Sequence, residues 1–195
     1  RARPHTGLAD MHVRLKEEDL PAYLAAGISS EHVGPSGRPR HGRAHSRRDA
    51  QWTWESGTFV SPTLVVRKAL SERNSSAADV ASAIGNRRTL VGALHDAYVP
   101  ILLGTDSGID IVAAGSSVHA ELQELVAAGL TPYEALVAGT VVAAQFLGEQ
   151  AEFGAVREGL RADLLLLSRN PLADITAAAA TLGVVANGAW YPGEP

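Results

Sequence analysis

The stretch VPILLGTDSG, residues 99–108, joins an apolar run to a polar, glycine-rich turn. An unbroken apolar run of this length is typical of a strand buried on both faces of a parallel sheet. Asp106 follows the run directly. In parallel α/β folds, ligands gather at the carboxyl ends of the strands. Asp106 is therefore a candidate functional residue, although such a turn can also be purely structural.

Strand and helix patterns alternate on both sides of this stretch. Before it, the sequence predicts strands at 7–13, 28–33 and 58–66, and helices at 17–26 and 77–96. After it, helices are predicted at 117–128 and from Pro132 to about Leu147. Thr131 caps the second of these helices, with Glu134 three residues later. Late strands fall in 162–168 and 183–191. The alternation predicts a parallel α/β arrangement with an appended β element.

The composition limits the class of protein. A chain of 195 residues with 46% apolar residues suits one globular domain with a real core. The absence of cysteine excludes disulfides and cysteine-based zinc sites. No apolar run reaches the roughly 18 residues of a membrane span, so no membrane partner is expected. Without cysteine or a signal-peptide core, the sequence favours the cytoplasm.

Two histidines share the placement of Asp106. His12 and His32 each stand near the end of a predicted strand. Two imidazoles and a carboxylate that converge at one edge of a sheet would suit a divalent metal such as zinc. His119, at the start of a helix after the turn, is a candidate substrate contact. For each residue taken alone, packing or solvation is the alternative interpretation.

Residues 33–48 form an atypical Arg-rich loop. They hold five Arg and no acidic residue, whereas the rest of the chain has 12 basic residues against 21 acidic ones. A basic segment can bind nucleic acid. This one contains no aromatic residue for base stacking, so the sequence favours a solvated loop over a nucleic-acid-binding module.

Several blocks of the sequence resemble the amidohydrolase superfamily, in particular its imidazolonepropionase-like and Xaa-Pro-dipeptidase-like members. These blocks are ILLGTDSG (101–108), HAELQELVAAGLTPYEAL (119–136), the segment 153–175 with RADLLLLSRNPL, and GVVANGAW (183–190). Upstream, residues 11–33 resemble the stretch with the fifth and sixth barrel strands, and residues 57–66 resemble the seventh. The resemblance spans most of the chain except 34–50.

The resemblance implies a distorted TIM barrel beside a small β-sandwich, and hydrolysis of C–N bonds with one or two divalent metals. His12 and His32 resemble the metal ligands of strands five and six. Asp106 resembles the strand-eight aspartate, which binds metal and takes the proton of the attacking water. The implied substrate is a small amide, cyclic amide or dipeptide. Residues 1–150 would form a partial barrel, strands five to eight, and residues 151–195 the β-sandwich return strands.

The chain also departs from the family pattern. The His-x-His pair of strand one and the lysine of strand four have no counterpart, so the chain resembles the carboxyl-terminal half of an amidohydrolase. A complete barrel takes roughly 250 residues. The alternative interpretation is a non-catalytic half barrel that needs an oligomer or a complementing chain. The abrupt composition of 33–48 also suggests a segment read out of the native frame.

Overall fold

The computed structural model describes residues 3–6, 8–13, 28–33 and 59–193. For the first three of these ranges it describes the backbone only. The predicted helix at 17–26 and residues 34–48 of the Arg-rich loop lie outside the described residues.

Two short parallel pairings confirm part of the predicted α/β arrangement. Strand β2 (Leu8–Val13) pairs in parallel with β3 (Ile28–Val33). The register sets Asp10 against Glu31 and Val13 against Val33, with an irregularity between these positions. A second parallel contact is the isolated bridge between Val60 and Ile101. The predicted strands at 7–13 and 28–33 are therefore confirmed.

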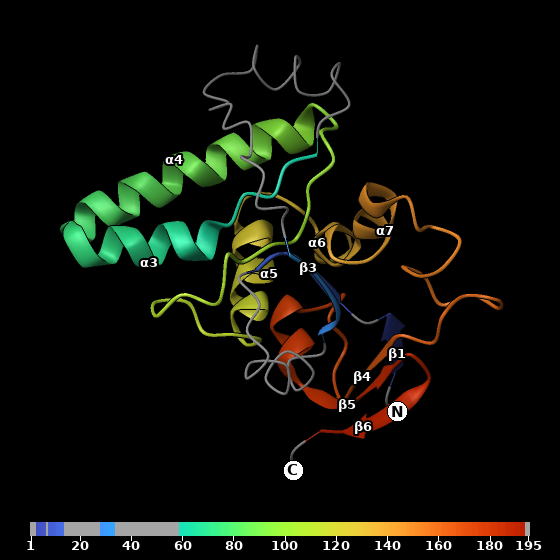
Figure 1. The fold of residues 1–195 in the computed structure, drawn as a ribbon. Helices are drawn as coiled ribbons and strands as arrows, with labels where there is room; N and C mark the ends of the chain where they lie inside the picture. The colour runs from blue at the N-terminus through green and yellow to red at the C-terminus, as the bar shows by residue number, and fades with distance from the viewer. Residues whose placement is uncertain (1–2, 7, 14–27, 34–58, 194–195) are drawn as a thin grey trace.

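An antiparallel sheet contains the late strands. Its order is β1 (Arg3–Thr6), β4 (Leu164–Leu167), β5 (Thr181–Ala186), β6 (Ala189–Pro192), with every pairing antiparallel. Figure 1 shows this sheet, mostly built from the carboxyl-terminal part of the chain, on the far side of the molecule from α3 and α4. The structure confirms late β strands and adds the amino-terminal β1 to them. The predicted division of the chain at residue 150 stays a prediction.

The segment 183–191, predicted as strand, contains a hairpin turn. Asn187 and Gly188 both have positive φ, 49° and 79°, which is the backbone of a tight hairpin turn. Asn and Gly are the residues that tolerate this conformation most readily. The Asn-Gly pair is thus the sequence signal for the break between β5 and β6.

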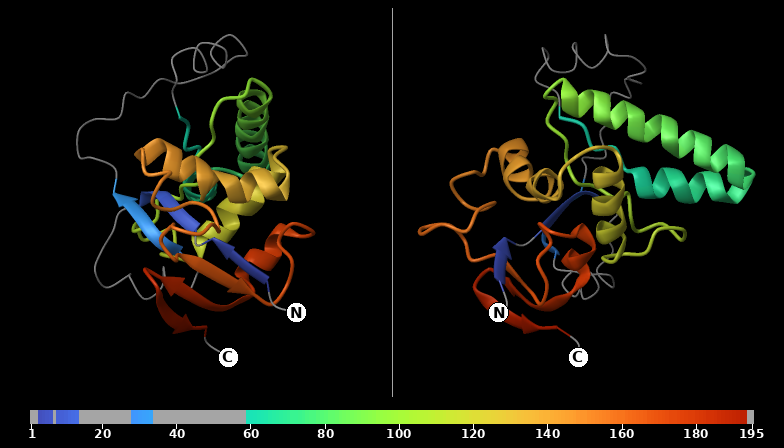
Figure 2. Two further views of the ribbon diagram at one scale, coloured as in Figure 1. Left: turned by 90° about the vertical axis from the view of Figure 1, so that its right-hand side faces the viewer. Right: turned by 180° about the vertical axis from the view of Figure 1, so that it is seen from behind.

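Residues 59–193 contain five α-helices. They are α3 (Leu64–Asn74), α4 (Ala77–Asp96), α5 (Ser117–Ala127), α6 (Pro132–Ala138) and α7 (Val141–Leu147). A 3₁₀ helix, η2 (Ile175–Ala179), lies between β4 and β5. Helices α3 and α4 form a hairpin that projects from the body, as Figure 2 also shows from behind. Helix α5 packs against α3, α4, α6 and η2. It carries the centre of the core, because Val118, Leu122 and Leu125 are all 0% exposed.

The start of α6 follows the prediction closely. The hydroxyl of Thr131 accepts a hydrogen bond from the Glu134 backbone N–H, and the Glu134 carboxylate accepts one from the Thr131 N–H. This reciprocal pair satisfies two N–H groups that have no partner inside the helix. The helix does not run on to Leu147, however. It ends at Ala138, with Gly139 as its C-cap, and the irregular backbone of Thr140 (φ −130°, ψ −88°) separates it from α7.

The predicted strand at 58–66 is wrong. Only Val60 makes a bridge, Thr63 has a left-handed backbone with φ 48°, and α3 begins at Leu64. The β-branched residues Val65 and Val66 favour a strand by local preference alone. A tertiary contact overrides that preference, because a buried carboxylate from another helix binds the first N–H groups of α3.

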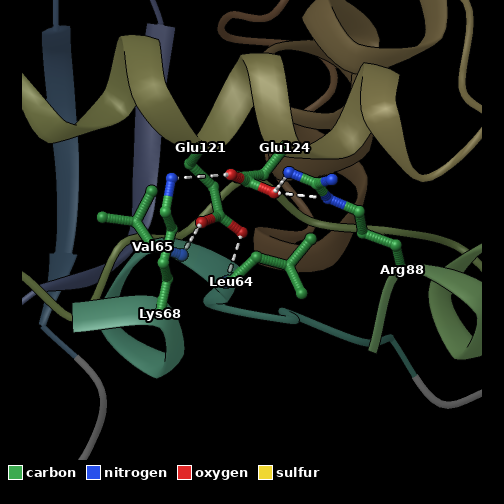
Figure 3. A network of polar contacts seen from close by, with 6 residues as sticks. All are labelled: Leu64, Val65, Lys68, Arg88, Glu121 and Glu124. Atoms are coloured by element: carbon green, nitrogen blue, oxygen red, sulfur yellow. Dashed lines mark hydrogen bonds and ion pairs between the residues drawn. The ribbon is translucent and has the colours of Figure 1, made fainter. Parts of the chain in front are cut away.

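That carboxylate belongs to Glu121 of α5, which is 0% exposed (Figure 3). Its Oε1 accepts a hydrogen bond of 2.9 Å from the Leu64 N–H, and its Oε2 one of 2.7 Å from the Val65 N–H. The first N–H groups of a helix have no partner within the helix and carry a partial positive charge. Glu121 supplies both the acceptors and the negative charge.

Glu124, one turn further along α5, binds both helices of the projecting hairpin (Figure 3). Arg88 of α4 approaches Glu124 Oε2 through Nη2 at 2.6 Å and Nε at 2.7 Å, and Lys68 Nζ of α3 lies 3.8 Å from Oε1. Glu124 is 7% exposed, so its two cations are screened less than a surface pair would be. Helix α5 therefore anchors α3 and α4 through two carboxylates on one face.

Within the described residues, no helix combines the length and the apolar character that crossing a membrane would require.

Replacing Glu121 with Ala should destabilise the fold strongly. The change leaves the Leu64 and Val65 N–H groups without acceptors in a buried place, at about 1–3 kcal/mol each. We expect a loss of about 3 kcal/mol or more in the free energy of unfolding, measured by urea denaturation. Gln123→Ala, on the exposed side of the same helix, should change the free energy of unfolding by less than about 0.5 kcal/mol. Equal effects of the two substitutions would contradict the capping role of Glu121.

Gly183 should not tolerate a side chain. A Cβ there would lie 2.1 Å from Cη2 of Trp190 and 2.8 Å from the backbone oxygen of Tyr191. The indole can shift but the backbone oxygen cannot, so Gly183→Ala should cost about 1–3 kcal/mol, the range for overpacking. A Cβ on Gly85, in the exposed middle of α4, meets nothing within 4 Å. Gly85→Ala should instead stabilise the protein by up to about 1 kcal/mol. Thermal unfolding of both variants tests the contrast.

Candidate functional site

The turn that carries Asp106 follows a buried apolar segment. Ile101, Leu102 and Leu103 are at most 5% exposed. The Leu102 N–H donates to the Val60 carbonyl at 2.8 Å, and the Leu103 N–H donates to the Ala138 carbonyl at 3.2 Å. These bonds fix the segment between the chain at residue 60 and the end of α6. The structure thus confirms a buried segment directly before Asp106, although only Ile101 within it pairs as a strand would.

The backbone at Asp106 is left-handed, with φ 54°. Few residues other than Gly adopt this conformation, and Asp is among those that do so most readily. Its neighbours Thr105 and Ser107 are both 0% exposed, and the Ser107 N–H donates to Thr105 Oγ1 at 3.1 Å. Asp106 itself is half-buried. The turn therefore leaves Asp106 more exposed than its two flanking residues.

His12 and His32 occupy matching places in the parallel pair. Each is the penultimate residue of its strand, β2 and β3 respectively. The strands run in parallel with Val13 against Val33, so the two histidines stand at the carboxyl ends of neighbouring strands. That placement agrees with the expectation from the sequence. The side chains of both histidines lie outside the part of the protein that the structure describes.

His119 is the third residue of α5 and is half-buried. Burial away from water lowers the pKa of His119 below its ordinary value, because desolvation disfavours the charged imidazolium. Its Nδ1 is buried and makes no hydrogen bond within the described residues, and neither does Oγ of nearby Ser117. A neutral imidazole with a free nitrogen can accept or donate one hydrogen bond to a ligand.

The donor set fits the metal that the sequence suggests. Imidazole nitrogens and a carboxylate are ligands that zinc prefers, and three protein ligands leave a place for water. Among the side chains that the structure describes, no group of three or more His, Cys, Asp or Glu residues is arranged to hold a metal ion. His12 and His32 are not in that set. Their convergence with Asp106 on one ion therefore remains a prediction.

Sequence reasoning missed two important polar residues, Glu121 and Glu124. Both are buried, on the same helix as the buried residues Val118, Leu122 and Leu125. Glu121 lies at the edge of the apolar face formed by these three residues, which is a sequence signal for a buried carboxylate that needs partners. Glu124 lies further round the helix and gives no such signal. The partners described for them are on α3 and α4, which gives both carboxylates a structural role.

Comparison with known proteins identifies the family of this chain. A model of the amidohydrolase family matches residues 5–190, nearly the whole chain. The ochratoxinase of Aspergillus niger is 44% identical over 81 residues, which are 40% of this chain and 16% of that protein.

Solved structures resemble the fold as well. The crystal structure of A. niger ochratoxinase aligns with a TM-score of 0.65 and 26% identity, over 96% of this chain and 42% of that one. A Xaa-Pro dipeptidase with methionine bound in its active site aligns with a TM-score of 0.63 and 22% identity, over 76% of this chain and 39% of that one. The chain therefore spans less than half the length of these relatives.

These neighbours imply a TIM-barrel-type fold. The chain belongs to the amidohydrolase family.

Proposed function

We propose that this chain is the carboxyl-terminal part of a metal-dependent amidohydrolase that cleaves amide or peptide-like C–N bonds with an activated water. The observation that carries the proposal is the placement of Asp106. It stands in a left-handed turn directly after the buried segment that pairs in parallel with Val60. In a barrel of parallel strands, this end of the sheet is where catalytic residues gather.

The fold proposed for the site is a half barrel. The β2–β3 pair and the Val60–Ile101 bridge are two separate parallel pairings, and we infer that their four segments correspond to strands five to eight. The antiparallel sheet β1-β4-β5-β6 would correspond to the β-sandwich at the side of the barrel. Support comes from the family match over residues 5–190 and from the alignment with ochratoxinase.

His12, His32 and Asp106 would hold the metal, with zinc as the ion that best suits two imidazoles and a carboxylate. When bound, such a metal lowers the pKa of a bound water towards about 7 and polarises the scissile carbonyl. Asp106 would accept the proton of the attacking water and pass it to the leaving amine, which needs hydrogen-bond reach to both atoms. Asp106 is half-buried, whereas its two neighbours in the turn are fully buried.

His119 would contact the substrate. Since desolvation keeps its imidazole neutral near neutral pH, it could donate or accept a hydrogen bond without adding charge to the site. The substrate class follows from the relatives, an ochratoxinase and a Xaa-Pro dipeptidase. We propose small amides or dipeptides as the substrates. We also propose a cytoplasmic location for the protein.

A second candidate is a half barrel without activity of its own. It is favoured by the share of the relatives that the chain spans, 42% of the ochratoxinase structure. The ligands of this chain alone would leave the metal site incomplete, and an oligomer or a complementing chain would have to supply the rest. No observation on the described residues favours the nucleic-acid alternative, whose Arg-rich segment lies outside them.

Asp106→Asn should abolish hydrolysis while leaving the fold intact. General-base catalysis contributes about 10²–10⁴-fold, so we expect kcat/KM to fall at least about 100-fold. The assay would follow release of the amine from N-acyl amino acids and Xaa-Pro dipeptides with added Zn²⁺.

Asp110→Asn, an exposed carboxylate four residues further along, is the matched control and should keep full activity. Equal activity of the Asp106 variant and the parent would refute the assigned base. A parent chain that is inactive alone but active with a complementing amino-terminal half would instead support the second candidate.

Metal binding tests His12 and His32 independently of turnover. Replacing either with Ala removes a proposed ligand, so the affinity for Zn²⁺ should fall at least about 10-fold in competition with a chelating dye. His5→Ala, on β1 of the antiparallel sheet, should leave the affinity unchanged. Unaltered zinc affinity in both variants, with correct folding by circular dichroism, would rule out these two ligands.

A further inference from the structure

The turn between β5 and β6 contains a chemically reactive pair of residues, Asn187 and Gly188. Both are exposed, and both have a left-handed backbone. An asparagine can lose its side-chain amide without an enzyme when the backbone nitrogen of the next residue attacks the side-chain carbonyl carbon. Glycine in the next position favours this attack, because it has no Cβ to hinder the close approach. The sequence therefore places a reactive asparagine in a turn that solvent reaches.

In the folded hairpin, the attacking nitrogen is already engaged in a hydrogen bond. The Gly188 N–H donates to the Ala162 carbonyl at 3.0 Å, two residues before β4 begins. A backbone nitrogen attacks only after it has lost its proton. While the N–H is bound to the Ala162 oxygen, loss of this proton would set a negatively charged nitrogen against the lone pairs of that oxygen. The hydrogen bond therefore suppresses the reaction for as long as the turn stays in contact with the chain before β4.

A buried carboxylate, that of Asp163, holds the same turn. Asp163 is 6% exposed, and its Oδ1 accepts a hydrogen bond of 2.8 Å from the Asn187 N–H. Its Oδ2 accepts one of 2.6 Å from Arg161 Nε, and the guanidinium carbon of Arg161 lies 5.1 Å from the centroid of the Phe153 ring. Hydrogen bonds to an ionised acceptor are stronger than those between neutral groups. Asp163 is therefore fixed by Arg161 and in turn fixes the backbone at Asn187.

We propose that Asn187 is a site of spontaneous deamidation, and that Asp163 and the Ala162 carbonyl protect it in the folded hairpin. When the turn opens, the Gly188 nitrogen forms a bond to Asn187 Cγ, and the side-chain amide group leaves as ammonia. The proton of the attacking nitrogen ends on the ammonia. Water then opens the five-membered imide at either of its two carbonyl carbons, which leaves aspartate or isoaspartate at position 187.

The product no longer fits the native turn. It adds a carboxylate to the residue whose backbone N–H binds the Asp163 carboxylate, and like charges repel. Isoaspartate also lengthens the main chain by a methylene group within the turn that sets the register of β6 against β5. Because the reaction needs an open turn, the modified fraction increases with the time that the hairpin has spent open.

Peptide mapping by mass spectrometry tests the assigned site in the full chain, at mildly alkaline pH, which favours loss of the amide proton. Conversion of Asn187 should be at least about 10-fold faster in the urea-unfolded chain than in the folded chain, because opening is then no longer required. Absence of conversion at Asn187 in the unfolded chain would overturn the site. Equal rates in the two states would overturn protection by the fold.

Asp163→Asn tests the protecting carboxylate. Conversion of Asn187 should become at least about 10-fold faster, as expected for loss of a hydrogen bond to a charged group. Asn74, the last residue of α3, should convert at the parent rate in the same sample. Glu158→Gln, which changes an exposed carboxylate five residues earlier, is the matched control and should leave both rates unchanged. An unchanged rate at Asn187 in the folded Asp163 variant would overturn the role of Asp163.

A measurement on the parent chain does not depend on the folding of a variant. Hydrogen exchange at the Gly188 amide reports opening of the turn directly. Urea below the unfolding transition should raise this exchange rate and the rate of Asn187 conversion by the same factor. Conversion that stays constant while the Gly188 exchange rate rises would overturn the proposal.

Discussion

The placement of the Asp106 segment depends on one buried carboxylate, that of Glu121. By accepting hydrogen bonds from the first two N–H groups of α3, it sets where the chain stops being extended and becomes helical. That point lies just after Val60, whose carbonyl accepts the Leu102 N–H and thereby positions the segment before Asp106. Since Glu121 is on α5, the helix after the turn also fixes the chain before it. A single side chain, that of Glu121, thus connects the chain before the Asp106 turn to the helix after it.

Elements with strong local signals were predicted correctly from the sequence. The Thr131–Glu134 pair and Pro132 fix the start of α6, and the helix predicted at 117–128 corresponds to α5 (Ser117–Ala127). The wrong prediction of a strand at 58–66 has its cause in a tertiary contact. Val65 and Val66 favour a strand locally, but the contact with Glu121, 56 residues away from Val65, makes them helical. A contact at that separation leaves no local pattern in the sequence.

Some features of the candidate site could likewise be predicted from the sequence, and others could not. Apolar runs followed by polar residues were enough to predict that His12 and His32 stand at strand ends, and the parallel register of β2 and β3 agrees. The left-handed backbone of Asp106 could not be predicted, because Asp also occurs in many turns with negative φ. The buried, unpartnered Nδ1 of His119 likewise depends on what packs around α5, which the sequence of the helix alone does not specify.

The contact of Trp190 with Gly183 has a consequence for the evolution of the sheet. The indole occupies the space where any other residue at 183 would place its Cβ. The two positions are therefore coupled, and a mutation at one changes which residues are acceptable at the other. A smaller side chain at 190 would remove the indole from this space, whereas the backbone oxygen of Tyr191 would still lie 2.8 Å from a Cβ at 183. A lineage that reduces Trp190 first therefore lowers the cost of a side chain at 183 without abolishing it, so the order of the two substitutions affects the stability of the intermediate proteins.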